Sequence, residues 1–534
     1  MSTQGFDIVV IGAGHNGLVA ANYLAMGGKR VCVLERRHVV GGAAVTEEFH
    51  PGYRNSIASY VVSLLRPEVI HDLELKRHGY QTLPLNNSFY PGLDGEYLLL
   101  TNDEAHNRRE FEKFSATDYE SAEHFHEIVD RVGEIFVKQW LREPPRLSNG
   151  GIADLISTLK LGMDFKKLDE DTRYRFMQIM IGTPATVINR WFESDKIKAM
   201  FAQHCLPANY ASLHQPGSSL PMLHHAVGGV DGEKGAWALV KGGMGGITQA
   251  MAKSAEEKGV VIRTDAAVQE IIVSKNRVTG VRLQNGETID SRCVAANTDP
   301  KRTFLQFLGK EHLPESFAKD ISVLRQESAS LRINLALSGL PNFACLPGED
   351  IGEHHRASIS IIESMDHVEQ AYRSARSGVP ANPTMIEAII PSTIDDSLTQ
   401  PGHHVMSLLC KYMPYQLADG TTWDEQKQSV VDDILGYLTR YIPNLPDIHV
   451  ATQCLTPKDI ERVFGMTGGD ICHAKLEPDQ LFSARPHPDA AQYATPVPGL
   501  YLCGSGAHPG GGVTGAPGHN AARRILKDWS SVIA

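Results

Sequence analysis

The chain has 534 residues, 42% of them hydrophobic, and a formal net charge of −11. This length and apolar content predict a folded protein of about two to four domains and exclude a largely disordered one. The acidic charge balance excludes sequence-independent binding to nucleic acid, which needs a basic surface.

The eight cysteines are scattered along the chain. No two of them form a CxxC or CxxxxC pair, which excludes a zinc ribbon and the redox disulfide of glutathione-reductase-type enzymes. Isolated cysteines are typical of a reducing compartment, and neither a secretory signal nor a transit peptide precedes the first strand. No run of about 18 apolar residues is present to span a membrane. We therefore expect a cytoplasmic protein without a transmembrane segment, and the sequence leaves peripheral membrane contact open.

The N-terminal residues predict a βαβ unit. Residues 6–11 form an apolar, β-branched run typical of a strand that is buried on both faces. Residues 17–27 follow as an alanine-rich helix that Gly27 and Gly28 close, and residues 30–35 form a second strand. The expected result is a parallel sheet of the Rossmann type.

A glycine-rich turn joins the first strand to the helix. It has the pattern GxGxxG and consists of Gly12, Ala13, Gly14, His15, Asn16 and Gly17. Gly12 permits a tight turn, Gly14 lets the backbone approach a pyrophosphate, and Gly17 lets helix and strand pack closely. The free N–H groups at the start of the helix favour phosphate charge, and Glu35 can accept hydrogen bonds from ribose hydroxyls. These features predict a dinucleotide site, for either NAD or FAD.

The residues after the second strand favour FAD. A basic pair and a second glycine pair follow Glu35, namely Arg36, Arg37, Gly41 and Gly42. This segment resembles the E-x-R-x-x-x-G-G element of flavoprotein amine oxidases and phytoene desaturases, in which the second glycine pair lies against the flavin end of FAD. The resemblance implies that these residues contact the cofactor. Amine oxidases usually continue with arginine, whereas Ala43 follows here, which disfavours amine oxidation.

Two further segments resemble the same superfamily. Residues 241–247 open a glycine-rich helix that leads to the strand at Val268, whose backbone meets the adenine in the family. Residues 499–513 resemble the phytoene desaturase pattern L-Y-x-x-G-x-G-x-H-P-G-x-G. The resemblance places four of these residues at the flavin and its ribitol chain, namely Gly504, Ser505, Gly512 and Val513. Many FAD enzymes have an acid at the position of Ser505, so the serine favours the desaturase branch.

Within this superfamily the sequence resembles one family more closely. Residues 10–21, 35–48, 191–194 and 500–513 are similar to the pyridine nucleotide-disulfide oxidoreductase domain-containing protein 2 family. Its members are phytoene-desaturase-like flavoproteins without an assigned substrate, and the similarity runs along nearly the whole chain. Animal members are mitochondrial and carry an N-terminal extension that this sequence lacks.

The motifs and the resemblance together imply an α/β fold. We expect a Rossmann-type, glutathione-reductase-like FAD-binding domain with an interleaved α+β substrate domain and a helical cap. The FAD-binding domain is expected to be discontinuous and to use residues 1–85, 236–304 and 481–534. Residues 86–235 are expected to form the helical cap and substrate region, and residues 305–480 the substrate domain.

Candidates for catalysis are few. His508 lies in the loop expected beside the flavin and is the one candidate for acid–base chemistry, although it fits a role in satisfying loop backbone equally well. His124 and His126 suggest metal ligands together with Glu127 and Asp130, but they do not form HExxH and lie in a charged helical stretch. We therefore expect no metal.

The function that the resemblance implies is that of an FAD-dependent oxidoreductase. The expected substrate is a small lipophilic molecule, a polyene or an isoprenoid, from which FAD takes a hydride or two electrons. The sequence does not identify the electron acceptor or the oligomeric state. Two alternatives stay open: an amine oxidase, and a flavin-binding regulatory or interaction protein with little turnover.

Overall fold

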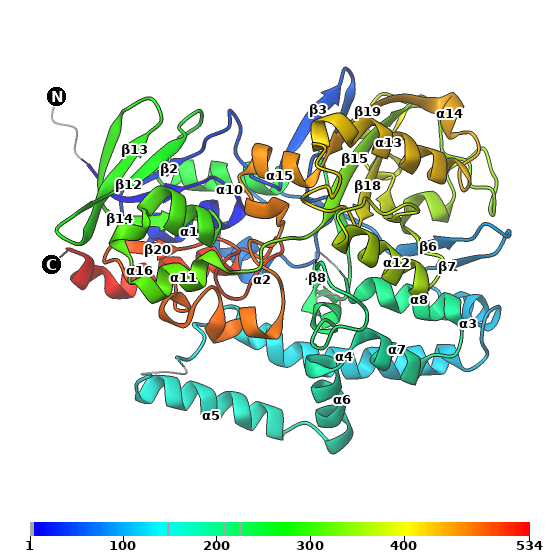
Figure 1. Cartoon of the computed structure of the whole chain (residues 1–534), viewed down its shortest axis with the longest axis horizontal. Helices are drawn as coiled ribbons and strands as arrows, with labels where there is room; N and C mark the ends of the chain where they lie inside the picture. The colour runs from blue at the N-terminus through cyan, green and yellow to red at the C-terminus, as the bar shows by residue number, and fades with distance from the viewer. Residues whose placement is uncertain (1–4, 147–149, 207–208, 224–226, 534) are drawn as a thin grey trace.

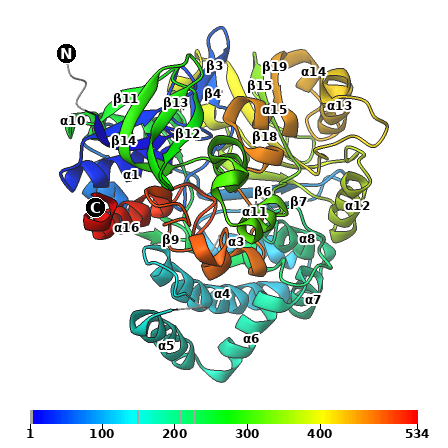
Figure 2. The same ribbon diagram turned by 60° about the vertical axis from the view of Figure 1, so that its left-hand side comes forward.

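The computed structural model describes residues 5–146, 150–206, 209–223 and 227–533. Two seven-stranded sheets lie side by side, and a group of helices lies beneath them (Figures 1 and 2). None of the helices in the described ranges combines the length and the apolar content needed to cross a membrane.

The first sheet contains the predicted βαβ unit. Its strands are β1 (Phe6–Ile11), β2 (Val31–Leu34), β11 (Val261–Arg263), β12 (Val268–Ser274), β13 (Arg277–Leu283), β14 (Thr288–Ala296) and β20 (Leu500–Leu502). The order is β11-β2-β1-β14-β13-β12, and β20 also pairs with β14. Strand β1 lies parallel to both β2 and β14, and β14 lies parallel to β20. The Rossmann-type sheet is thus confirmed, and three separated segments of the chain build it.

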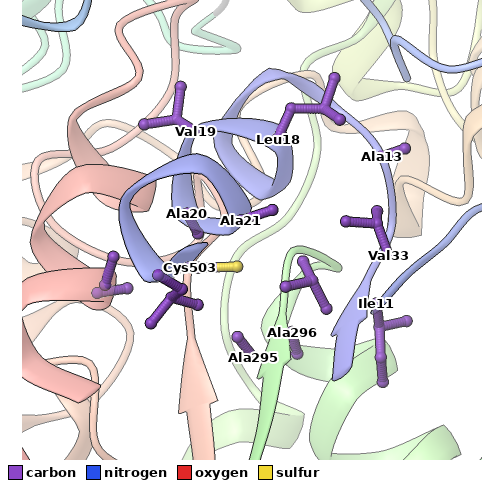
Figure 3. Packing of buried hydrophobic residues seen from close by; sticks show 14 of the residues in the cluster. Ile11, Ala13, Leu18, Val19, Ala20, Ala21, Val33, Ala295, Ala296 and Cys503 are labelled. Atoms are coloured by element: carbon purple, nitrogen blue, oxygen red, sulfur yellow. The ribbon is translucent and has the colours of Figure 1, made fainter. Parts of the chain in front are cut away.

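Three helices pack close to this sheet, namely α1 (His15–Met26), α10 (Gly245–Glu257) and α16 (Ala516–Ile533). Figure 3 shows Ala20 and Ala21 of α1 close to Ala296 and Cys503, at the ends of β14 and β20. Helix α16 crosses α1 at Gly518, where an added Cβ would lie 2.1 Å from the carbonyl oxygen of Asn16. Small side chains therefore let the helices approach the sheet and one another closely.

The second sheet has the order β19-β15-β18-β17-β16-β6-β7. Its strands are β6 (Asn87–Pro91), β7 (Tyr97–Leu100), β15 (Ser330–Leu337), β16 (Ala357–Ile361), β17 (Met385–Ile389), β18 (His404–Lys411) and β19 (His449–Leu455). Leu331 and Ile333 of β15 share a core with α13 (Trp423–Thr439). Because side chains alternate along a strand, Ser330 and Arg332 face the opposite side of the sheet.

The helical group spans much of the region for which the sequence predicted a cap. It consists of α3 (Glu104–Glu112), α4 (Asp118–Trp140), α5 (Ile152–Lys166), α6 (Glu170–Ile181), α7 (Pro184–Trp191) and α8 (Asp195–His204). Residues 87–100, at the start of that region, instead form the β6–β7 hairpin at the edge of the second sheet. The division of the chain into three domains stays a prediction.

Shorter elements connect these layers. They are β3 (Thr46–His50), β4 (Tyr53–Ser56), α2 (Pro67–Asp72), β5 (Thr82–Pro84), β8 (Gly229–Val230), β9 (Glu233–Lys234), β10 (Ala238–Val240), α11 (Glu315–Ser322), α12 (Met365–Arg376), α14 (Leu445–Ile448) and α15 (Pro457–Phe464). Strands β3 and β4 pair with each other, and β5 pairs with β10. Residues 58–64, in the segment between β4 and β5, line the cavity described next.

Candidate active site

A cavity of about 850 Å³ is lined by residues from both large sheets. One end, here called the α1 end, is lined by the turn before α1 and by residues 34–37 at the end of β2. The other, the α4 end, is lined by the second sheet together with α4 and α8. The two ends belong to one continuous space, so a molecule bound at one end can meet a molecule bound at the other.

The α1 end brings together predicted cofactor residues from all three segments. Those that line the cavity are Gly12, Gly14, His15, Glu35, Arg36, Arg37, Gly42, Ala43, Val268, Ser505, Gly512 and Val513. The remaining predicted residues, which do not line it, are Ala13, Asn16, Gly17, Gly41 and Gly504. Of these, Asn16 Nδ2 donates a hydrogen bond of 3.2 Å to Ser505 Oγ. This bond joins the first segment of the chain directly to the last.

The carboxylate of Glu35 is held by two backbone N–H groups. Oε2 accepts a hydrogen bond of 2.9 Å from the N–H of Ala13, and Oε1 accepts one of 2.9 Å from the N–H of Arg37. Each carboxylate oxygen can accept a further hydrogen bond. The side chain is therefore fixed in position and keeps the acceptor capacity that a ribose diol needs.

The start of α1 fits a pyrophosphate. Its N-cap residue, Gly14, makes no side-chain capping hydrogen bond, so the first N–H groups of the helix face outward without an acceptor from the cap. An added Cβ on Gly17 would lie 2.2 Å from the carbonyl oxygen of Gly12, so only glycine allows this turn to sit on the helix. The residues present therefore fit a dinucleotide cofactor at the α1 end.

Arg485 supports the C-terminal loop and was not predicted from the sequence. Its side chain is fully buried, and the Nη2 atom donates hydrogen bonds of 2.7 Å to the carbonyl oxygens of Ser505 and Cys472. Nη1 donates to the carbonyl oxygen of Gln480 over 3.1 Å. The arginine thus fixes the glycine-rich loop against residues 472–480. An isolated arginine in an irregular segment has no spacing pattern, so its role cannot be predicted from the sequence.

His508 is buried beneath the C-terminal loop and does not line the cavity. Its Nε2 donates a hydrogen bond of 3.0 Å to the carbonyl oxygen of Gln139 in α4. Burial lowers the pKa of His508 to about 4. This position favours a role in satisfying backbone groups over a role in acid–base chemistry. The neutral ring joins the loop to α4 and does not reach the cavity.

His508 should make the protein sensitive to acid. In the unfolded chain histidine has its ordinary pKa of 6.5, whereas the folded value is about 4. As the pH falls through this window the unfolded state binds the proton first, so the free energy of unfolding decreases, by about 3 kcal/mol in total. Urea unfolding at a series of pH values should show a smaller loss in His508→Asn than in the wild type, with the remainder due to other buried histidines such as His15 and His354, whose pKa values burial also lowers to about 4. His214→Asn, which changes an exposed histidine, should keep the wild-type slope; parallel curves for wild type and His508→Asn would contradict the prediction.

The α4 end has a charged floor on the second sheet. Lys411 of β18 is 1% exposed, and its Nζ donates a hydrogen bond of 2.9 Å to Glu387 Oε1 on β17. The hydroxyl of Tyr60 donates to Glu387 Oε2, also over 2.9 Å. Burial alone would raise the pKa of Glu387, but the charge and hydrogen bonds of Lys411 and Tyr60 outweigh it and lower this pKa. Glu387 is therefore held as a carboxylate beside a buried cation.

Helices α4 and α8 contribute both apolar and polar side chains to the α4 end. The apolar ones are Phe125 and Val129 of α4 and Phe201 of α8, and Met222 lies beside the cavity with them. His126 and Asp130, from the stretch that suggested metal ligands, also reach the cavity, as do Gln203 and His204. Among the described residues, no group of three or more His, Cys, Asp or Glu side chains is placed to hold a metal ion. The α4 end thus combines an apolar wall, interrupted by polar side chains, with a charged floor.

The chain matches two protein families. Residues 10–72 match the NAD(P)-binding Rossmann-like domain, and residues 71–300 match the flavin containing amine oxidoreductase family. The chain is 41% identical to pyridine nucleotide-disulfide oxidoreductase domain-containing protein 2 of Rattus norvegicus, over 99% of this chain and 94% of the rat protein. The chain belongs to this family.

More distant matches define the wider group. Phytoene desaturase (lycopene-forming) of Pseudescherichia vulneris is 26% identical, over 95% of this chain and 96% of the desaturase. A redesigned putrescine oxidase has the same fold, with a TM-score of 0.61 and 13% identity over 98% of this chain and 99% of that one. Members of the pyridine nucleotide-disulfide oxidoreductase domain-containing protein 2 family thus share the fold of flavin-dependent oxidoreductases. The matched flavin family and the residues of the α1 end together support FAD as the cofactor of this oxidoreductase.

Proposed function

We propose that this protein is an FAD-dependent oxidoreductase that removes a hydride, or two electrons, from a lipophilic polyene or isoprenoid-like substrate. The observation that supports the substrate class is the apolar wall of the α4 end, which is continuous with the α1 end. The similarity to phytoene desaturase agrees with this class. When bound, FAD supplies the acceptor for the two electrons.

Different residues of the chain would hold the cofactor and the substrate. The N–H groups at the start of α1 would bind the pyrophosphate, and Glu35 would bind the ribose hydroxyls. Arg485 fixes the loop that carries Ser505, Gly512 and Val513, so this loop is rigid before the cofactor binds. Phe125 and Phe201 would exclude water from the lipophilic substrate.

The experiment that tests the proposal is anaerobic reduction of the purified, FAD-loaded protein. A panel of phytoene, squalene, limonene, benzylamine and putrescine separates the substrate classes. We expect a polyene or isoprenoid to bleach the visible flavin absorbance and the amines to leave it unchanged. Bleaching by the amines alone would establish the amine oxidase alternative. Full FAD occupancy without bleaching by any member would favour the regulatory alternative.

We also propose a cytoplasmic location. All eight cysteines are free thiols in the structure, and seven of them are buried. Free thiols are typical of a reducing compartment. Fractionation of the producing cells, followed by detection of the protein in the soluble or membrane fraction, tests the proposal.

A further inference from the structure

Arg332 of β15 has an unsatisfied charge in the floor of the α4 end. The residue is 3% exposed and lines the cavity. Its Nη2 donates a hydrogen bond of 2.5 Å to Ser407 Oγ, whereas Nε and Nη1 have no hydrogen-bond partner among the described residues. Buried guanidinium groups are normally paired with an anion, because a charge that is removed from water without a partner is strongly disfavoured.

The nearest acidic side chain is already engaged. Glu387 accepts hydrogen bonds from Lys411 and Tyr60, each 2.9 Å long. The guanidinium of Arg332 instead lies over the ring of Tyr60, 4.5 Å from its centroid. Within this floor two cations, Arg332 and Lys411, therefore share one carboxylate, which leaves an excess of one positive charge.

The surroundings of Arg332 oppose its positive charge. Burial lowers the pKa of Arg332 below its usual value, which means that the charged form is disfavoured where it lies. An anion bound to Nε or Nη1 would reverse this effect. The two atoms lie on different edges of the guanidinium plane, and each offers an N–H for a charge-assisted hydrogen bond to a carboxylate oxygen.

The net charge of the floor favours a bound carboxylate over a bound phosphate. A carboxylate carries one negative charge and matches the single excess positive charge of the floor. A phosphate monoester carries about −1.5 to −2 at neutral pH and would leave a buried negative excess. Phe125, Val129 and Met222 also line this end of the cavity, and they offer an apolar surface to the rest of the bound molecule.

We propose that Arg332 binds the carboxylate of a lipophilic acid whose apolar chain lies along α4 and α8. This inference rests on the proposed function, because it assigns the α4 end to the substrate, and it adds the polar group that orients the substrate. Arg332 is thereby a specificity-determining residue rather than a group that carries out the chemistry.

Binding of three ligands with one common chain tests the proposal. Oleate, oleyl alcohol and oleylamine differ only in the head group, and calorimetric titration of the FAD-loaded protein, below the micelle concentration of each, gives their dissociation constants. We expect wild-type protein to bind oleate about tenfold or more tightly than the alcohol, and the amine most weakly. Equal or tighter binding of the alcohol or the amine would overturn the proposal without any variant.

Substitutions then assign the preference to the arginine. Arg332→Met should bind oleate and oleyl alcohol with equal affinity, and Arg332→Lys should keep part of the preference, because it keeps the charge and loses the guanidinium donors. Arg440→Met, at an exposed arginine that follows α13, should behave as wild type. If Arg332→Met does not fold, the lysine variant decides the assignment, since full retention of the preference would show that the guanidinium donors do not hold the carboxylate.

The flavin content of the variants distinguishes this inference from the proposed function on which it rests. Arg332→Met should retain wild-type FAD content and visible spectrum, and loss of FAD would show that the arginine serves the cofactor instead. A preference for oleate that depends on Arg332 supports the inference even if no polyene or isoprenoid bleaches the flavin. Bleaching by a neutral isoprenoid without any preference for oleate would support the proposed function and overturn the inference.

Discussion

Gly17→Ala is expected to yield a folded protein that purifies without FAD. The new Cβ would lie 2.2 Å from the carbonyl oxygen of Gly12 and 3.0 Å from Asn297 Nδ2. The Gly12 carbonyl is backbone and already accepts a hydrogen bond from Asn297 Nδ2, so the turn must move away from α1. The displaced turn can no longer hold the pyrophosphate at the helix start, and overpacking of this kind costs about 1–3 kcal/mol of stability.

Flavin stoichiometry after purification, followed by FAD titration of the apoprotein, measures this effect. We expect the affinity to fall by at least about tenfold, which corresponds to about 1.4 kcal/mol. Gly436→Ala is the matched control, because a Cβ at this position in α13 meets no atom within 4 Å. Wild-type FAD content in Gly17→Ala would show that the contact between turn and helix does not define the cofactor site.

Lys411→Met should lower the free energy of unfolding by up to about 3–5 kcal/mol, because it removes the cation that is hydrogen-bonded to the buried carboxylate of Glu387. The double variant Lys411→Met with Glu387→Leu should recover most of this loss, since it removes both charges. Urea unfolding at fixed FAD concentration measures both effects. Arg282→Met breaks an exposed pair with Glu270 and should cost no more than about 1 kcal/mol.

The pH dependence of the single variant provides a second measurement. In wild type the pKa of Glu387 is lowered, so its contribution to stability is present at neutral pH and is lost as the pH falls through the folded pKa. In Lys411→Met burial is no longer opposed by the lysine, and the folded pKa should rise above the unfolded value. The variant should then gain stability relative to wild type as the pH falls, and a constant difference between the two would contradict the proposed pairing.

The cofactor half of the site could be predicted from the sequence because its determinants are local. Gly12, Gly14 and Gly17 act through backbone conformation within one turn, and Glu35 follows at the end of the next strand. The same holds for the first sheet, whose apolar runs at residues 6–11 and 30–35 became β1 and β2. Such patterns need no knowledge of distant contacts.

The α4 end could not be predicted because its polar residues come from separate strands and a loop. Tyr60, Arg332, Glu387 and Lys411 have no common spacing, and only the second sheet brings them together. A weak signal was present, since Arg332 and Lys411 are lone charges in otherwise apolar runs. His508 was placed correctly in its loop, but its contact with Gln139 of α4 depends on tertiary packing that the sequence does not encode locally.

The late position of β20 and α16 in the chain has a consequence for biosynthesis. Strand β14 receives its partner β20, and α1 receives α16, only after residues 500–533 have emerged from the ribosome. Until then one flank of α1 and the edge of β14 remain exposed to other nascent chains, and Asn16 lacks Ser505. The complete site for the vitamin-derived cofactor, which includes Ser505, therefore forms only after the end of the chain has been synthesised.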